Sequence, residues 1–221
     1  MIRVFKSENA PASLATTGSY DGEDVKKQLL EDQCGKCFVC ERKLTTDFEI
    51  DNLKSRVAYP ELTQTWQNLH LICGYCNRKK ANRFDGILSP SKVNIEDEIT
   101  QRMGENCKQP VFSATVNDER HNKTIELLSN VFNGTGKIRN TKEERFFNQF
   151  RSAYNSFLAA ISRYVYSHSK DAECDLAQEL SIDKEFLGFK YHLVKSNAEL
   201  NEKFADLMTW NKNLECHPYI G

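Results

Sequence analysis

The sequence predicts an α+β protein in which a small metal-stapled module precedes a mainly α-helical domain. Two Cys-x-x-Cys pairs lie between Cys37 and Cys76, and short strand-like runs separate them. Beyond residue 118, apolar side chains recur at helical spacing. The chain has 221 residues, of which 39% are hydrophobic and 28% charged, which is typical of an ordinary globular protein with a packed core.

The pattern changes along the chain divide it into four parts. Gly86 and Pro90 end the cysteine-containing module, and an irregular polar stretch follows it. We expect an N-terminal extension with a short helix at 1–33, the metal-stapled module at 34–90, a connector at 91–118 and a helical docking domain at 119–221.

Two strands and several helices are expected within these parts. The strand-like runs are Phe48 to Leu53 and Leu69 to Ile72, and a basic helix should follow from Asn77 to Phe84. Aromatic residues from Phe146 to Val165 keep the 3–4 spacing of a long helix, and we interpret them as core residues, with a base-stacking surface as the alternative. Thr141-x-x-Glu144 and Ser196-x-x-Glu199 are expected to cap helices, and shorter helices are expected at about 118–132 and 171–194.

The sequence lacks the features of a membrane or secreted protein. No apolar run approaches the length of about 18 residues that spans a bilayer, and the first residues lack the apolar core of a secretory signal. We therefore expect a cytoplasmic protein with no membrane partner.

The charge is nearly balanced overall but biased locally. The formal net charge is −1, whereas nucleic-acid-binding domains usually carry a clear positive excess. Between Asp51 and Phe84, however, basic residues outnumber the two acidic ones, Asp51 and Glu61; they are Lys54, Arg56, Arg78, Lys79, Lys80 and Arg83. Phosphate groups could be met along this stretch.

The four paired cysteines predict one structural zinc site. Cys37-x-x-Cys40 and Cys73-x-x-Cys76 can converge on one tetrahedral ion, and four thiolates leave no coordination position open for water. A redox pair is the competing interpretation, but it normally sits alone at a helix start in a thioredoxin-like fold. Cys34 is treated as a bystander.

The residues around the cysteines carry a specific resemblance. Their order is Cys-x-x-Cys, then Ile50-Asp51-Asn52, then Trp66-Gln67-Asn68-Leu69, then Cys-x-x-Cys-Asn77-Arg78-Lys79-Lys80. This series resembles the HNH endonuclease family, whose ββα-metal fold is held by a four-cysteine zinc. Hydrolysis of a phosphodiester needs a general base, a divalent cation and oxygen ligands for that cation, and the motif carries groups of these kinds.

The resemblance implies a role for each of four positions. Asp51 and Asn77 would hold Mg²⁺ or Mn²⁺, position 52 would be the general base, and Asn68 would orient it. Taken singly, each residue has a plainer interpretation: Asp51 and Asn52 as a turn, Asn68 as a partner of loop backbone, and Asn77 as a helix cap.

The chain departs from the family pattern at position 52. Asparagine cannot accept a proton near neutral pH, so Asn52 is expected to impair catalysis. Since the remainder of the motif is intact, a deliberate His→Asn inactivation is favoured over natural decay, which stays open as the alternative. A register shifted to Glu49-Ile50 supplies no histidine either. His70 should face opposite to its leucine neighbours, at the surface or behind the site residues, with a rescue base as the minority alternative.

Four cations near the motif are candidate nucleic-acid contacts, with a solvated helix face as the alternative for each. They are Lys54, Arg56, Lys80 and Arg83.

A narrower resemblance concerns the N-terminal ninety residues. Ala10-Pro11 and the approach to Cys37 through Asp32-Gln33 are similar to the HNH subunit (PtuB) of Septu-type antiphage systems, including retron-associated ones. This likeness implies an ABC/SMC-like ATPase partner (PtuA-like), and in retrons also a reverse transcriptase with its RNA–DNA product. An acidic run could dock such a partner or be a solvated helix face; it comprises Asp171, Glu173, Asp175, Glu179, Asp183 and Glu185.

The sequence therefore predicts an HNH-type nuclease effector of an antiphage complex, acting on DNA or RNA. The alternative is a non-catalytic, zinc-stabilised nucleic-acid-binding or adaptor subunit of the ATPase complex.

Overall fold

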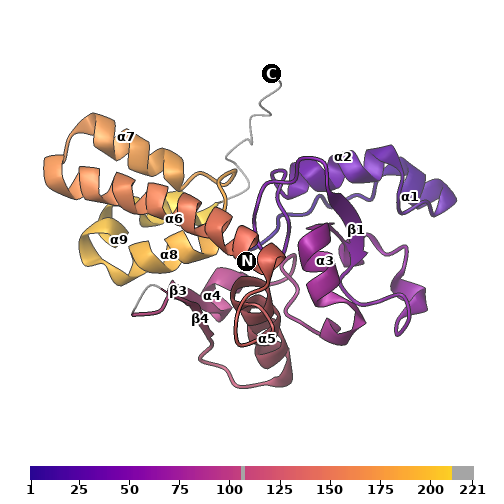
Figure 1. Cartoon of the computed structure of the whole chain (residues 1–221). Helices are drawn as coiled ribbons and strands as arrows, with labels where there is room; N and C mark the ends of the chain where they lie inside the picture. Colours follow the sequence, from indigo (N-terminus) through magenta and orange to yellow (C-terminus); the bar gives the residue numbers. More distant parts are fainter. Residues whose placement is uncertain (106–107, 211–221) are drawn as a thin grey trace.

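The computed structural model describes residues 1–105 and 108–210, and its mixed α+β architecture confirms the predicted fold class (Figure 1). Two helices, α1 (Ala12–Thr17) and α2 (Glu23–Asp32), precede the cysteine-containing module. The last eleven residues of the expected helical domain lie outside the described residues.

The module is a two-stranded antiparallel hairpin followed by a helix. Strand β1 (Phe48–Asn52) pairs with β2 (Leu69–Cys73), so that Asp51 lies opposite His70. The connection contains the short 3₁₀ helices η1 (Pro60–Leu62) and η2 (Trp66–Asn68). Helix α3 (Gly74–Lys80) follows β2 directly and ends one turn earlier than expected, because a kink at Ala81 separates it from the 3₁₀ helix η3 (Asn82–Phe84).

The two faces of the β1–β2 hairpin have different neighbours. Leu69 and Leu71 share a buried cluster with Val25 and Leu29 of α2, so this face packs against the N-terminal helices. Since side chains alternate along a strand, Asp51 and its partner His70 lie on the other face, which is covered by α3.

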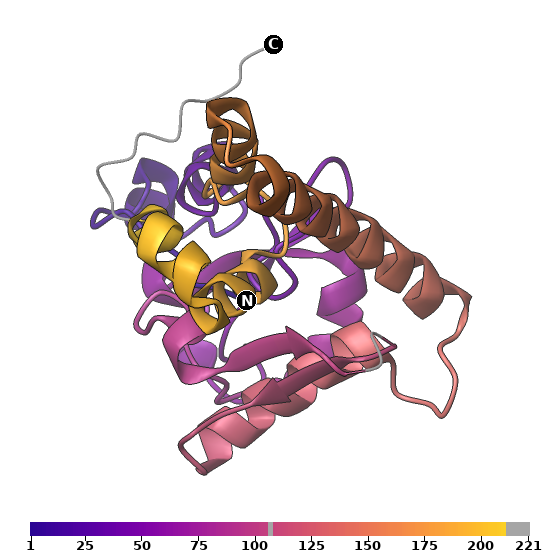
Figure 2. The ribbon, with the colours of Figure 1, turned by 90° about the vertical axis from the view of Figure 1, so that its left-hand side faces the viewer.

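The expected connector contains regular structure that the sequence analysis did not predict. It holds α4 (Ile95–Glu98) and an antiparallel hairpin of β3 (Thr100–Met103) and β4 (Pro110–Ser113). Helix α5 packs against β4 and α8 against β3, as Figure 2 shows. Strand β3 could not be recognised from the sequence because its inward residue is polar. Gln101 is fully buried, and its amide donates to the Met1 carbonyl.

The remaining chain is helical, as expected. Its elements are α5 (Glu119–Asn133), α6 (Thr141–Ser167), α7 (Lys170–Glu179), α8 (Leu187–Ser196), α9 (Ala198–Phe204) and η4 (Ala205–Thr209). The aromatic stripe of α6 is core, as interpreted from its spacing: Phe150 is fully buried and packs on Phe132, Phe186 and Phe189. No described helix is long and apolar enough to cross a membrane.

Three helix boundaries differ from the sequence expectations. The capping box of α6 is formed by Asn140 and Glu143, one residue before the expected pair, because the Asn140 amide oxygen accepts the first-turn backbone N–H groups. Asn197, not Ser196, caps α9. The segment expected to be helical at 171–194 is broken between α7 and α8.

Helical residues and the cysteine module share one apolar core. Phe38 and Cys73 belong to the same buried cluster as Phe150 and Phe189. Glu41, buried beside Cys40, accepts backbone N–H groups from Leu187 at 2.7 Å and Gly188 at 3.1 Å, and so caps the start of α8. The described residues of the two parts therefore pack together around one apolar core.

Candidate functional site

Four cysteine side chains converge at the junction of β2 and α3. The Sγ atoms of Cys37, Cys40, Cys73 and Cys76 all lie within 4.8 Å of one another, and the four residues are buried. Among the described residues they form the one group of three or more histidine, cysteine or acidic side chains placed to hold a metal. The backbone N–H of Cys76 donates to the Cys73 Sγ, a contact that favours a thiolate.

This donor set fits structural zinc. Four sulfur ligands match the tetrahedral preference of Zn²⁺, and burial leaves no side open for substrate or solvent. Buried thiols without an ion would place four weak hydrogen-bonding groups against one another. The cluster staples the loop after α2 to the β2–α3 junction and so fixes where α3 begins.

The face of β1 that looks toward α3 carries two carboxylates. Glu49 and Asp51 are two residues apart on one side of the strand, and they meet Asn77 and Lys80, one turn apart on α3. The Asn77 Nδ2 donates to the Glu49 Oε2 at 2.8 Å. The Lys80 Nζ lies 3.0 Å from the Asp51 Oδ2 and donates to the Asn52 carbonyl at 2.9 Å.

This pairing differs from the one that the motif implies. Asp51 and Asn77 are on facing elements, as expected of two ligands to one cation, yet each is paired with another side chain. Because the Asn77 amide nitrogen points at Glu49, its oxygen is the atom left for a cation. Burial raises the pKa of Asp51, against the opposing effect of the Lys80 ammonium, with Asp85 and Glu49 raising it further. A cationic group is therefore stabilising beside Asp51.

Asn52 and Asn68 both bond to backbone. The Asn52 side chain is buried, and its Nδ2 donates to the Thr63 carbonyl at 3.0 Å, on the side of the strand away from Asp51. The Asn68 Oδ1 accepts the Lys54 N–H at 2.8 Å, and its Nδ2 donates to the carbonyls of Lys54 and Leu62. Asn68 thus fixes the chain just after position 52, and its side-chain hydrogen bonds go to backbone and not to the Asn52 side chain.

The four-cysteine cluster and the strand–strand–helix order of this region agree with its similarity to a known family. Residues 34–83 match the model of the HNH endonuclease family. No curated protein matches the chain. The matched residues, called the HNH segment below, contain all four cysteines, both strands and α3. The match to this family supports a metal-dependent nuclease activity of the HNH segment in general terms.

His70 is the one histidine of the HNH segment, and it is fully buried. It faces opposite to its leucine neighbours, as expected, but the expected surface position is wrong. Its ring lies 5.0 Å from that of Phe38, and neither ring nitrogen has a hydrogen-bond partner among the described residues. Burial lowers the pKa of His70 well below its ordinary value, and the cations Lys6 and Lys80 add to the effect. In this arrangement the imidazole is enclosed and out of reach of a substrate.

The four expected nucleic-acid contacts separate into two groups. Lys54, Arg56 and Arg83 are exposed, and Arg56 donates to the Tyr20 hydroxyl while Arg83 pairs with Glu126 at 2.8 Å. Lys80 differs from the expectation: it is 1% exposed, because the helical period places it one turn after Asn77 on the face toward β1. Its ammonium meets Asp51 and the Asn52 carbonyl, not solvent.

Sequence reasoning missed Glu49 as a member of the site and assigned Lys80 to nucleic-acid contact, not to the pairing with Asp51. The signal was present in the two periods: an alternating strand puts Glu49 on the face of Asp51, and an i,i+3 step on a helix puts Lys80 beside Asn77. The basic run around Lys80 concealed its burial, since charged runs are usually solvated.

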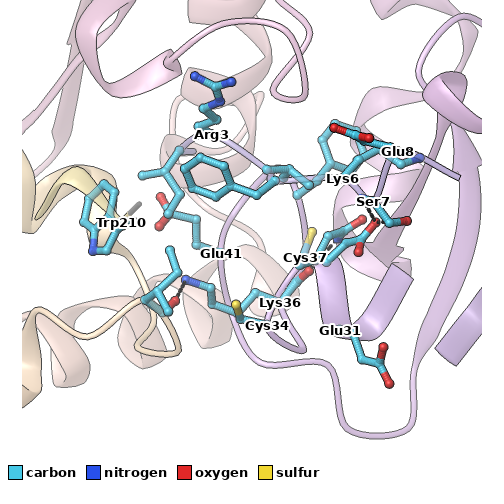
Figure 3. Close-up of a pocket in the computed structure, with 17 residues that line it drawn as sticks. Arg3, Lys6, Ser7, Glu8, Glu31, Cys34, Lys36, Cys37, Glu41 and Trp210 are labelled. Carbon is cyan, nitrogen blue, oxygen red and sulfur yellow. Dashed lines mark hydrogen bonds between the residues drawn. The ribbon is translucent and has the colours of Figure 1, made fainter. Parts of the chain in front are cut away.

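A separate pocket of about 410 Å³ lies between residues 3–8, the end of α2 and Trp210 (Figure 3). Figure 3 shows Lys36 in the wall of this pocket, and its ammonium donates to the Ile182 carbonyl at 2.5 Å. None of the four motif residues lines this pocket. It is therefore distinct from the candidate nuclease site.

Proposed function

We propose that the chain is an HNH-type, metal-dependent nuclease that hydrolyses phosphodiester bonds in nucleic acid and is impaired by Asn52. The main observation behind this proposal is that two carboxylates of β1 face the helix that carries Asn77, within the HNH segment and its four-cysteine cluster. Oxygen donors on two elements suit a hard divalent cation, for which the proposal names Mg²⁺ or Mn²⁺.

Asp51, Asn77 and, from its position, Glu49 would hold the cation. Such an ion supplies Lewis-acid stabilisation of the charge that develops on the scissile phosphate. Lys80 holds Asp51 and the end of β1 against α3, so that the carboxylate has a fixed position. Asn68 hydrogen-bonds to the backbone of Lys54 and so fixes the chain just after position 52.

The proton-accepting group is the missing part of this machinery. An amide cannot take a proton from water, and the Asn52 amide is engaged with the Thr63 carbonyl. His70 is enclosed and cannot replace it. A general base contributes about 10²–10⁴ in rate, so the chain should bind nucleic acid and cleave it poorly. We infer that Asn52 is an inactivating replacement of histidine.

The Asn52→His variant tests the proposal. It places an imidazole at the end of β1; because the Asn52 amide lies on the side of the strand away from Asp51, the imidazole must turn from Thr63 toward Asp51 to act as the base. Metal-dependent cleavage of DNA or RNA should then rise by about 10²-fold or more. Asp51→Asn in the same background should abolish the gain, whereas Glu61→Gln, an exposed acid on η1, should leave it intact. The assay includes the expected ATPase partner. If the variant cleaves neither DNA nor RNA faster than the Asn52 chain under these conditions, the nuclease assignment is refuted.

A second candidate is a non-catalytic, zinc-stabilised nucleic-acid-binding or adaptor subunit. The Lys80–Asp51 ion pair favours it, because a buried ammonium already supplies the positive charge that a cation would bring. Binding of Mn²⁺ to the chain, measured by electron paramagnetic resonance, separates the two candidates. The nuclease site should bind the ion, whereas a non-catalytic module should not.

We propose that this nuclease works in the cytoplasm as the HNH effector of an antiphage complex with an ABC/SMC-like ATPase, and in a retron setting with a reverse transcriptase and its RNA–DNA product. The Septu-type resemblance supports this. The acidic run does not strengthen it, because Glu173, Asp175 and Glu179 pair with Lys203, Arg163 and Lys190 of the same chain. Co-purification of the full-length chain with an ATPase encoded beside it tests the partner, and its absence would remove the ATPase from the proposal.

A further inference from the structure

One flank of α3 is tied to the helical part of the molecule. The Tyr75 ring stacks on Phe146 of α6 with centroids 4.7 Å apart, and its hydroxyl donates to the Val131 carbonyl of α5 at 2.7 Å. Lys79 bonds to Glu143 in the first turn of α6. The start of α6 therefore lies beside the helix that carries Asn77 (Figure 1) and is fixed against it.

Two adjoining grooves run along this junction and share Tyr75, Arg78 and Lys142 in their walls. Their volumes are about 430 and 210 Å³. Six cationic side chains line them, against the two acidic ones Asp47 and Glu143, and Glu143 is already bonded to Lys79. The cations are Arg42, Arg78, Lys79, Arg83, Lys142 and Arg145.

Three of these cations have their charge available. Arg78, Lys142 and Arg145 are exposed, and none of them forms an ion pair within residues 1–105 and 108–210. They come from two elements, α3 and α6, that are separated in the sequence by the whole of α4, the β3–β4 hairpin and α5. Arg78 directly follows Asn77, so the groove begins beside the candidate site.

We propose that this surface, called the α3–α6 groove, binds the phosphodiester backbone of nucleic acid next to the HNH site. The inference rests on the proposed function, because it takes the substrate to be the ligand. Guanidinium groups bind phosphate oxygens through two parallel hydrogen bonds, and two rigid helices hold Arg78 and Arg145 at a fixed separation. The helical part thus contributes to substrate binding and is more than a platform for a partner.

The test measures binding separately from cleavage. Fluorescence anisotropy without added divalent cation compares the full chain with the triple variant R78Q/K142Q/R145Q on duplex DNA, single-stranded DNA and an RNA hairpin. Affinity for the preferred nucleic acid should fall on the order of tenfold or more at about 0.1 M salt. The slope of log K against log salt should decrease by about 2–3, since each lost phosphate contact removes about one.

A charge-matched control makes the test specific. R120Q/R151Q/K170Q removes three exposed cations that line neither groove, and it should keep wild-type affinity and slope. Equal losses of nucleic-acid affinity in both triple variants would overturn the groove assignment. They would not bear on the nuclease proposal, which the Asn52→His assay tests separately. Competition by polyglutamate as effective as that by DNA would also overturn it, because the groove would then be a site for an acidic protein.

Discussion

The four-cysteine cluster and the β1–α3 face of the HNH segment differ in how fully their side chains converge. The four cysteines meet in one buried cluster. A few residues away, Asp51 and Asn77 face each other across the hairpin and helix, yet Lys80 and Glu49 are their actual partners. The zinc cluster is arranged as a finished structural site, whereas the β1–α3 face holds its acids with the protein's own ammonium and amide groups.

The difference follows from the distance over which each site is specified. A Cys-x-x-Cys pair closes within one turn, so local geometry already places two ligands, and only one long-range approach is needed. The acidic site needs the strand alternation, the β1–β2 register and the helical phase of α3 all at once. The acidic site therefore depends on more long-range features of the fold than the cysteine cluster does.

The largest effect should come from breaking the zinc cluster. Cys73→Ser removes a ligand that also caps α3, so the chain should become insoluble or protease-sensitive, since metal binding in such sites is part of the folding free energy. Elemental analysis and limited proteolysis provide the measurement. Cys174→Ser, at an exposed cysteine, should behave as wild type. Well-folded protein without zinc would contradict the assignment.

The sequence predicted the convergence of the four cysteines and the fold class, but it left the faces of β1 and α3 undecided. Asp51 and Asn77 were recognised by their place in a motif, whereas Glu49 and Lys80 join the site only through the register and helical phase. His70 shows the limit of alternation: its direction was predicted, but its burial depends on Phe38, which packs over it from outside the strand pair.

Longer-range packing hid other features from the sequence. The β3–β4 hairpin has a polar inward residue, Gln101, which is satisfied by the chain's first residue and not by its own neighbours. The module and the helical part are packed together across the expected boundary, because Tyr75 and Phe146 belong to one core. A fragment ending at Pro90 would expose that core, so partner binding is better tested on the full chain.

The second expected effect concerns the internal cation of the acidic site. Lys80→Met removes the buried ammonium and leaves Asp51 without a partner, which should lower the free energy of unfolding by about 3 kcal/mol or more. Urea denaturation measures the change. Lys54→Met, at an exposed lysine next to the same strand, should alter it by less than about 0.5 kcal/mol. Equal stability of the two variants would show that Lys80 does not hold the site together.

The smallest effect should be on cation affinity at Glu49. Glu49 is exposed, and its carboxylate is hydrogen-bonded to Asn77, so Glu49→Gln should leave folding unchanged. If this carboxylate completes the oxygen ligands around Asp51 and Asn77, the variant should bind Mn²⁺ about tenfold more weakly, a loss of about 1.4 kcal/mol. Electron paramagnetic resonance titration of free Mn²⁺ reads the affinity without any need for catalysis. Glu61→Gln, exposed on the loop between the strands, serves as the charge-matched control. Wild-type affinity in Glu49→Gln, together with loss in Asp51→Asn, would return the site to the pair that the motif alone implies and assign Glu49 a purely structural bond to α3.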